Sequence, residues 1–226
     1  MDKQWAVLTG QDKSVLRPVT ADAPLLLHVD VLPHWQALVA AARAAGFGLA
    51  IASAWRGFER QQAIWNAKAS GTRIVLDASG RPLDTMRLTP DELLFAILRW
   101  SAIPGCSRHH WGTDLDIYDR DAVPDGYCVQ LVPDECTGCG PFAPLHAWLD
   151  NQLQRPDAVF YRPYATDCGG IAPEPWHLSC RPVADHFAAL LDEERMLDWL
   201  MQQDIALKDR IRVHWHEIFH RFVRLQ

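Results

Sequence analysis

The sequence of 226 residues contains no apolar run long enough to cross a membrane or to form the hydrophobic region of a signal peptide. It also has no cluster of lysine and arginine, and its formal net charge is -6. Nucleic acid and anionic membrane surfaces are therefore not expected as partners. These absences predict a cytoplasmic protein without a membrane span, or a periplasmic one if the start of the sequence is misassigned.

Internal repeats, low-complexity tracts and a second CxxC motif are missing as well. Six cysteines are present, but in a chain of this size without an export signal we expect reduced thiols. Cys136 and Cys139 have the spacing of half a zinc knuckle, which requires a second pair of ligands. We interpret them as two unrelated thiols, and a structural zinc that also uses Cys128 or Cys168 is the alternative.

The pattern of apolar residues, which make up 49% of the chain, predicts a folded α+β protein. Hydrophobic periodicity indicates helices over 33–45, 57–69 and 143–153, and strands over 47–53, 113–118 and 174–180. Thr89 and Glu92 form a capping box at a further helix start, a loop or hairpin is expected over 72–84, and a loop is expected over 120–141. Residues 1–181 form the main domain, and 182–226 form a helical extension packed on it, broken near 193 and 204.

The segment SRHHWGTDLDIYD, residues 107–119, is rich in possible metal ligands. If residues 113–118 form a strand, Asp114, Asp116 and Tyr118 lie on one face and the apolar residues lie on the other. Gly112 permits a sharp entry into the strand, so that His109 can fold back over the face that carries Asp116. His109 and Asp116 are therefore candidate metal ligands.

A hydrolytic zinc site has three protein ligands and one open position for the water that the metal acidifies. His177, in the segment EPWHLS, is the candidate third ligand. Glu174 lies three residues earlier, and Pro175 favours an extended backbone at Glu174. A carboxylate beside the reacting water is what a general base requires. Two histidines and one carboxylate suit zinc, although nickel or cobalt fit the same ligands.

Three ordered motifs resemble those of a known family. The pattern S-x-H-x-x-G-x-A-x-D is matched at Ser107, His109, Gly112 and Asp116, and E-x-W-H is matched at Glu174, Trp176 and His177. Upstream, SAWRGFERQ is similar to S-G-Y-R-S-x-x-x-Q, with matches at Ser53, Arg56 and Gln61. The chain thus resembles the zinc-dependent D-alanyl-D-alanine carboxypeptidases and dipeptidases, relatives of the vancomycin-resistance D,D-peptidases and of the hedgehog zinc fold. The resemblance implies a small mixed or antiparallel sheet with flanking helices.

The resemblance also implies roles for individual residues. It makes His109, Asp116 and His177 the ligands of one zinc ion. Glu174 becomes the general base and later the proton donor, and Arg56 stabilises the oxyanion. The candidate substrate-binding residues are Gln61, Ser107 and Ser53, the first two for the C-terminal carboxylate. Asp114 replaces the family's alanine, and it either orients a metal ligand or contacts a basic group on the substrate.

The expected function is removal of a C-terminal D-amino acid from a peptidoglycan-derived peptide or muropeptide, at a D-Ala-D-Ala or an L,D bond. One alternative is a D-Ala-D-Ala dipeptidase. The other is a catalytically silent zinc fold used for binding, as in hedgehog proteins, and the presence of Glu174 and Arg56 argues against it. The oligomeric state stays open.

A second metal-binding pattern lies near the C-terminus. Residues 216–220 match H-E-x-x-H, the pattern of a zincin helix. Zincins find a third ligand well downstream, whereas only six residues follow His220 here. We therefore interpret this segment as an amphipathic helix with ordinary histidines, and the helical tail has no assigned function.

Overall fold

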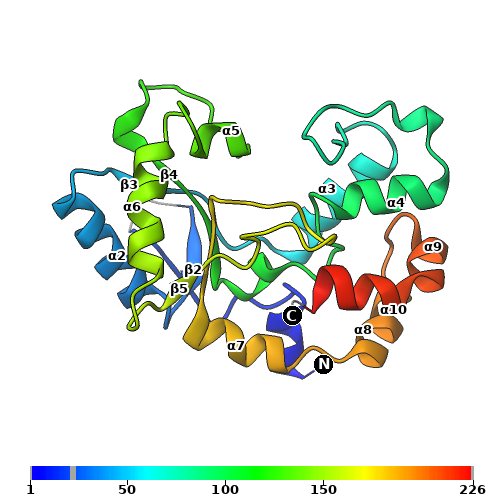
Figure 1. Ribbon diagram of the computed structural model, residues 1–226. Helices are drawn as coiled ribbons and strands as arrows, with labels where there is room; N and C mark the ends of the chain where they lie inside the picture. Colours follow the sequence, from blue (N-terminus) through cyan, green and yellow to red (C-terminus); the bar gives the residue numbers. More distant parts are fainter. Residues whose placement is uncertain (1, 21–23, 225–226) are drawn as a thin grey trace.

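The computed structural model describes residues 2–20 and 24–224. Its centre is an antiparallel sheet of four strands in the order β3 (Leu49–Ser53), β4 (Asp114–Asp119), β6 (His177–Cys180) and β5 (Phe160–Tyr161). A separate pair is formed by β1 (Leu16–Pro18) and β2 (Leu26–His28). Helices flank the sheet on both sides (Figure 1), and this mixture confirms the predicted α+β fold.

One face of the central sheet packs against two helices, α2 (Leu32–Ala44) and α6 (Ala143–Leu153). Leu115, Ile117 and Leu178 alternate along β4 and β6 and are fully buried in this core together with Leu145 and Leu149 of α6. The opposite face of the same strands is left free for polar side chains, because neighbouring residues of a strand point to opposite faces.

A second core is built from helices. It joins α1 (Lys3–Leu8), α3 (Phe58–Ala69) and α4 (Pro90–Leu98) to the C-terminal helices. The latter are α7 (Arg181–Ala189), α8 (Glu193–Leu200), α9 (Lys208–Val213) and α10 (Trp215–Ile218), which continues as a π-helix, η4 (Phe219–Val223). Trp65 of α3 is fully buried in this core, and its indole Nε1 donates to the backbone oxygen of Ala206 at 2.9 Å. The residues after 182 therefore share a core with α3 and α4.

Most of the predicted elements are present with small changes at their ends. The capping box is confirmed, because Thr89 Oγ1 accepts from the backbone N of Glu92 and Glu92 Oε2 accepts from the backbone N of Thr89. The expected strand over 174–180 begins only at His177. The expected loop over 120–141 contains two short helices, η3 (Arg120–Ala122) and α5 (Pro133–Cys136).

The buried carboxylate of Glu135 holds the chain that leads into α5, because it accepts the backbone N–H groups of Gln130 and Leu131. Two other short elements are η1 (Thr85–Arg87), directly after the expected loop or hairpin over 72–84, and η2 (Arg108–Trp111), which leads into β4. No helix within the described ranges has the length and apolar character needed to cross a bilayer.

Candidate metal centre

The register of β4 against β6 brings two predicted metal ligands together. Asp116 is paired with His177, and Asp114 is paired with Ser179. Residues opposite one another in antiparallel strands point to the same face of the sheet, as do residues two apart in one strand. Asp114, Asp116 and His177 therefore share the polar face, as the alternation of β4 predicted.

The third predicted ligand, His109, comes from η2. Gly112 ends this helix in a left-handed conformation, with φ 70°. A Cβ atom at this position would lie 2.5 Å from Leu16 Cδ2 and 2.9 Å from the backbone N of His28. The sharp turn and the close approach both require glycine. The turn brings His109 Nε2 to within 3.3 Å of Asp116 Oδ2.

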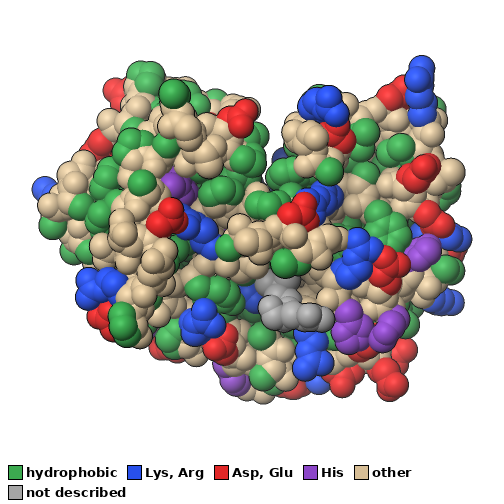
Figure 2. Space-filling view, in the orientation of Figure 1, with side chains coloured by type: hydrophobic (Ala, Val, Ile, Leu, Met, Phe, Trp, Pro, Cys, Tyr) green, Lys and Arg blue, Asp and Glu red, His purple; other side chains and the backbone are tan. Residues whose placement is uncertain are grey.

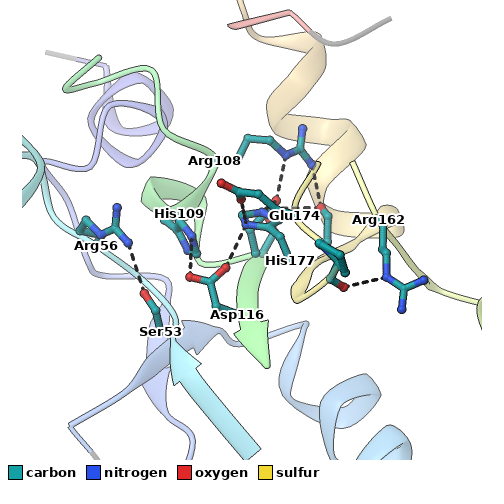
Figure 3. A network of polar contacts seen from close by, with 12 residues as sticks. Ser53, Arg56, Arg108, His109, Asp116, Arg162, Glu174 and His177 are labelled. Carbon is teal, nitrogen blue, oxygen red and sulfur yellow. Dashed lines mark hydrogen bonds and ion pairs between the residues drawn. The ribbon is translucent and has the colours of Figure 1, made fainter. Parts of the chain in front are cut away.

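The donor atoms of the three residues fit a divalent metal such as zinc. One ligand atom from each of His109, Asp116 and His177 lies within 4.8 Å of the other two (Figure 3). His177 Nδ1 and Asp116 Oδ1 are 3.0 Å apart, yet within the described structure both are buried without a hydrogen-bond partner. The ligands of a tetrahedral zinc ion, held at about 2.0–2.1 Å, lie roughly 3.3 Å from one another. The unpartnered atoms thus have the spacing that such an ion requires.

Asp114 orients the ring of His177 from the side opposite the candidate metal centre. Its side chain is fully buried, and its Oδ1 atom lies 2.9 Å from His177 Nε2 and accepts from Arg108 Nε at 2.8 Å. The other oxygen accepts from the hydroxyl groups of Thr113 and Ser179. The Nε2–H of His177 therefore donates to Asp114, which leaves Nδ1 for a metal. Of the two roles considered for Asp114, the structure supports the orientation of a ligand, and burial excludes contact with the substrate.

The charges around His177 favour a cation between the ligands. Burial by itself would raise the pKa of Asp116, but His109 and His177 lower it far below its ordinary value. Burial would likewise lower the pKa of His177, but the hydrogen bond to Asp114 and the nearby carboxylates of Asp116 and Glu174 raise it well above its ordinary value. Carboxylates that stay ionised around a buried imidazole hold either a proton or a metal ion, and metal binding displaces the proton.

Glu174 faces this centre from the loop that enters β6. Its Oε2 atom lies 3.4 Å from His177 Nδ1. The loop is held from two sides, because the backbone N of Glu174 donates to the backbone oxygen of Tyr164 and Arg162 Nε donates to the backbone oxygen of Pro175. Figure 3 shows Glu174 and Asp116 at the same imidazole ring. This placement agrees with the predicted general base.

In Figure 3, His109 lies between Arg56 and Glu174. The Nη1 atom of Arg56 donates to Gln61 Oε1 at 2.8 Å, and its Nη2 atom donates to Ser53 Oγ at 3.3 Å. Gln61 is 1% exposed, and its Nε2 atom donates to the backbone oxygen of Ala102. Both polar atoms of Gln61 thus have partners inside the protein, and this arrangement favours a role in holding Arg56 over the predicted binding of the substrate carboxylate. Ser53 also contacts Arg56 and is not among the residues that line the cavity, so the structure places it behind Arg56.

The backbone of Arg56 is fixed by the two adjacent histidines. Its N–H donates to the backbone oxygen of His109, and its carbonyl accepts from His110 Nδ1. His110 is fully buried, and its Nε2 atom accepts from the backbone N of Gly105. Burial lowers the pKa of His110 to about 3, so its ring is neutral. His110 therefore holds Arg56 in place, and it is not a metal ligand.

A cavity of about 260 Å³ extends from the metal centre. The three ligands, Glu174, Arg56 and Ser107 line it, together with residues that precede α5 and residues that follow α3. Figure 2 shows that the molecule is hollowed between these two parts. Ser107 is thus the one predicted substrate-binding residue that lines the cavity.

The sequence did not indicate that the cavity has a basic end. Lys68 and Arg73 line it, and Lys68 Nζ donates to Ser101 Oγ at 2.7 Å. Lys68 is 8% exposed, and burial, with the nearby charges of Arg73 and Arg56, lowers its pKa to about 8. Lys68 lies seven residues after Gln61 on α3, which is two helical turns on the same face, so helical periodicity was the available signal.

The aromatic wall of the cavity was also missed. The ring of Tyr164 packs edge-on against His177, with 4.9 Å between the ring centroids, and burial raises the pKa of its hydroxyl. Tyr164 belongs to an irregular segment that shows no periodicity in the sequence.

Comparison with known proteins identifies relatives of the chain. A family model described as VanY, D-alanyl-D-alanine carboxypeptidase, matches residues 24–183. An uncharacterized protein of Haemophilus influenzae is 41% identical over 99 residues, which are 43% of this chain and 68% of that protein. A D-alanyl-D-alanine carboxypeptidase of Enterococcus faecalis is 28% identical over 152 residues, which are 67% of this chain but 47% of the relative.

A solved structure has a similar fold. It is that of a mutant of the vancomycin resistance D,D-pentapeptidase VanY in complex with Zn(II). The TM-score is 0.50 at 24% sequence identity, and the superposition covers 87% of this chain and 88% of the other. At this level of identity the likeness shows a shared fold.

Proposed function

Because the chain belongs to the VanY family of D-alanyl-D-alanine carboxypeptidases, we propose that it is a zinc metallopeptidase that removes a C-terminal D-amino acid from peptidoglycan-derived peptides. The observation that carries the proposal is the convergence of His109, Asp116 and His177 with a carboxylate, Glu174, 3.4 Å from the ring of one ligand. A binding protein without activity needs the three ligands but neither Glu174 nor Arg56.

When bound to these ligands, zinc would polarise the scissile carbonyl and lower the pKa of the attacking water. Glu174 takes the proton of that water on Oε2 and later transfers it to the nitrogen of the leaving D-amino acid. The hydrogen bonds that fix its loop keep the carboxylate on the cavity side of His177.

Arg56 donates to the carbonyl oxygen as negative charge develops on it. Each Nη atom has two N–H groups, and one of each is used on Gln61 or Ser53. The remaining N–H groups are available to the substrate. Because Gln61 and Ser53 already hold the guanidinium group, it does not need to reorient during the reaction.

The charges of the cavity favour a carboxypeptidase over a dipeptidase. Free D-Ala-D-Ala carries an ammonium group, which requires a carboxylate partner. Among the described residues that line the cavity, the carboxylates are Asp116 and Glu174, and both already serve the metal centre. A longer peptide has an uncharged amide in place of the ammonium group. Its C-terminal carboxylate pairs with Lys68 at the basic end, and Ser107 is a second donor that lines the same cavity.

The test is mass spectrometry of muramyl pentapeptide, muramyl tetrapeptide and free D-Ala-D-Ala after incubation with the zinc-loaded protein. We expect loss of one D-alanine from a muramyl peptide and no cleavage of the free dipeptide. Cleavage of the pentapeptide alone would identify a D,D-carboxypeptidase, and cleavage of the tetrapeptide alone would identify an L,D-carboxypeptidase.

Glu174→Gln is the matched variant, because it keeps the size of the side chain and removes the base. We expect it to bind zinc as the wild type does and to lose about 10²–10⁴-fold in rate. Full activity of Glu174→Gln with zinc bound would exclude this mechanism. Absence of cleavage of every substrate by the zinc-loaded wild type would favour the silent binding fold.

A further inference from the structure

The C-terminal helices carry a second cluster of metal-binding side chains, about which the proposed peptidase function says nothing. His216 Nδ1 lies 2.9 Å from Glu193 Oε1, and His220 Nε2 lies 3.2 Å from Glu193 Oε2. One ligand atom from each of the three residues lies within 4.8 Å of the other two. The H-E-x-x-H pattern thus has a third potential ligand, which comes from upstream, at the first residue of α8.

His216 and His220 point to the same side of the C-terminal helix, away from the helical core. Residues four apart on a helix lie on one face. Ile218, Phe219 and Phe222 are buried in the helical core, so the opposite face is turned outward. The side chains of His216 and His220 are 83% and 42% exposed, and a metal ion in solution can reach them.

The backbone that carries the third potential ligand, Glu193, is held in place independently of any metal. Trp215 is buried, and its indole Nε1 donates to the backbone oxygen of Glu193 at 2.9 Å. This bond ties the start of α8 to the helix turn that carries His216. The three potential ligands are therefore already in position, which lowers the entropic cost of binding.

The two histidines converge on a single carboxylate. The two imidazole rings are 4.5 Å apart, and each places a nitrogen near a different oxygen of the same carboxylate. Two imidazoles and one carboxylate that converge in this way are ligand types that zinc favours.

We propose that Glu193, His216 and His220 bind a second divalent cation, with zinc as the fitting ion, and that it joins α8 to the C-terminal helix. The site differs from that of a zincin, since the intervening Glu217 pairs with Arg221. No base is therefore aimed at this ion, and its role is to hold the helices together. These helices share a core with α3, which carries Lys68 of the cavity.

The test is isothermal titration of zinc into the full chain after removal of metal, in four proteins. They are the wild type, His216→Ala/His220→Ala, His109→Ala/His177→Ala and the combination of all four substitutions. The exposed His216 and His220 can be replaced without a cavity in the core. The combined variant measures zinc bound by exposed thiols such as Cys128, Cys139 and Cys168.

We expect two binding events in the wild type, one in each double variant and none above the thiol background in the combined variant. We also expect zinc to raise the thermal midpoint of His109→Ala/His177→Ala but not that of the combined variant. Glu217→Gln is the control within the motif, and it should keep both events.

The second site is refuted if His216→Ala/His220→Ala binds zinc with the stoichiometry and affinity of the wild type. In that case the metal centre of the cleft is unaffected. Conversely, loss of zinc binding only in His216→Ala/His220→Ala would support the second site and contradict the peptidase proposal. The two proposals can thus fail separately.

Discussion

His177 Nε2 lies 2.9 Å from Oδ1 of Asp114, a carboxylate with no exposed surface. The same oxygen accepts from Arg108, so one buried carboxylate joins a fixed positive charge to a metal ligand. Burial would raise the pKa of Asp114, but Arg108 and His177, with the hydroxyl group of Thr113, keep it below its ordinary value. The ring of His177 is therefore oriented before any metal binds.

We predict that Asp114→Asn weakens zinc binding about 10–100-fold, because the amide interacts less strongly with the ring N–H of His177. The measurement is competition with a chromophoric chelator. Asp119→Asn is the matched control, since Asp119 is also buried in β4 but accepts from the backbone N of Gly48, away from the ligands. Equal affinities in the two variants would mean that packing alone orients His177.

The position of Gln61 behind Arg56 leads to a kinetic prediction. Gln61→Met removes the acceptor that holds the guanidinium, and we expect kcat to fall by about tenfold or more with a small change in KM. Gln62→Met is the control, because the neighbouring Gln62 donates to Asp204 on the far side of α3. A rise in KM with unchanged kcat would show instead that Gln61 binds the substrate.

The convergence of the candidate metal ligands was predictable because much of the signal lies in short segments. Period-two alternation in β4 places Asp114 and Asp116 on one face, and Gly112 marks the turn that returns His109 to it. The pairing of Asp116 with His177 also follows from the alternation of apolar and polar residues, since β4 and β6 bury their apolar residues on the same face of the sheet. For these residues, local structure and tertiary structure agree.

The features that the sequence did not predict depend on contacts between distant segments or on very short elements. Gln61 matches a family motif, and only the structure shows that Ala102 and Arg56 occupy its amide. Glu193 lies 23 residues from His216, and no spacing rule connects the two. The short strands β1, β2 and β5 were missed because two or three residues cannot establish a period.

The turn at Gly112 gives a prediction for stability. Gly112→Ala should destabilise the protein by roughly 2–5 kcal/mol, from about 1–2 for the left-handed backbone and about 1–3 for the clash with Leu16 and His28. Gly80→Ala is the matched control, because φ is 76° there and no heavy atom lies within 4 Å of the added Cβ. Denaturant unfolding of the metal-free proteins checks this. Equal losses in the two variants would show that the packing around Gly112 can relax.

Lys68 gives a prediction for pH dependence. Its pKa is lowered to about 8 by burial and by the charges of Arg73 and Arg56, while Glu174 opposes this shift. If the ammonium form binds the substrate carboxylate, kcat/KM falls as the pH rises through about 8, because this ratio reports the free enzyme.

The bound carboxylate favours the charged form of Lys68, so kcat at saturating substrate should persist to higher pH than kcat/KM. Lys68→Arg keeps its charge over the whole range and should move the alkaline fall in kcat/KM upward. Lys68→Met should lower kcat/KM below about pH 8, where the wild-type ammonium group is charged, and remove the fall near this pH. Profiles of kcat/KM against pH for the three proteins test the assignment. An alkaline fall at the same pH in Lys68→Arg as in the wild type would assign it to another group and leave the substrate carboxylate without Lys68 as its partner.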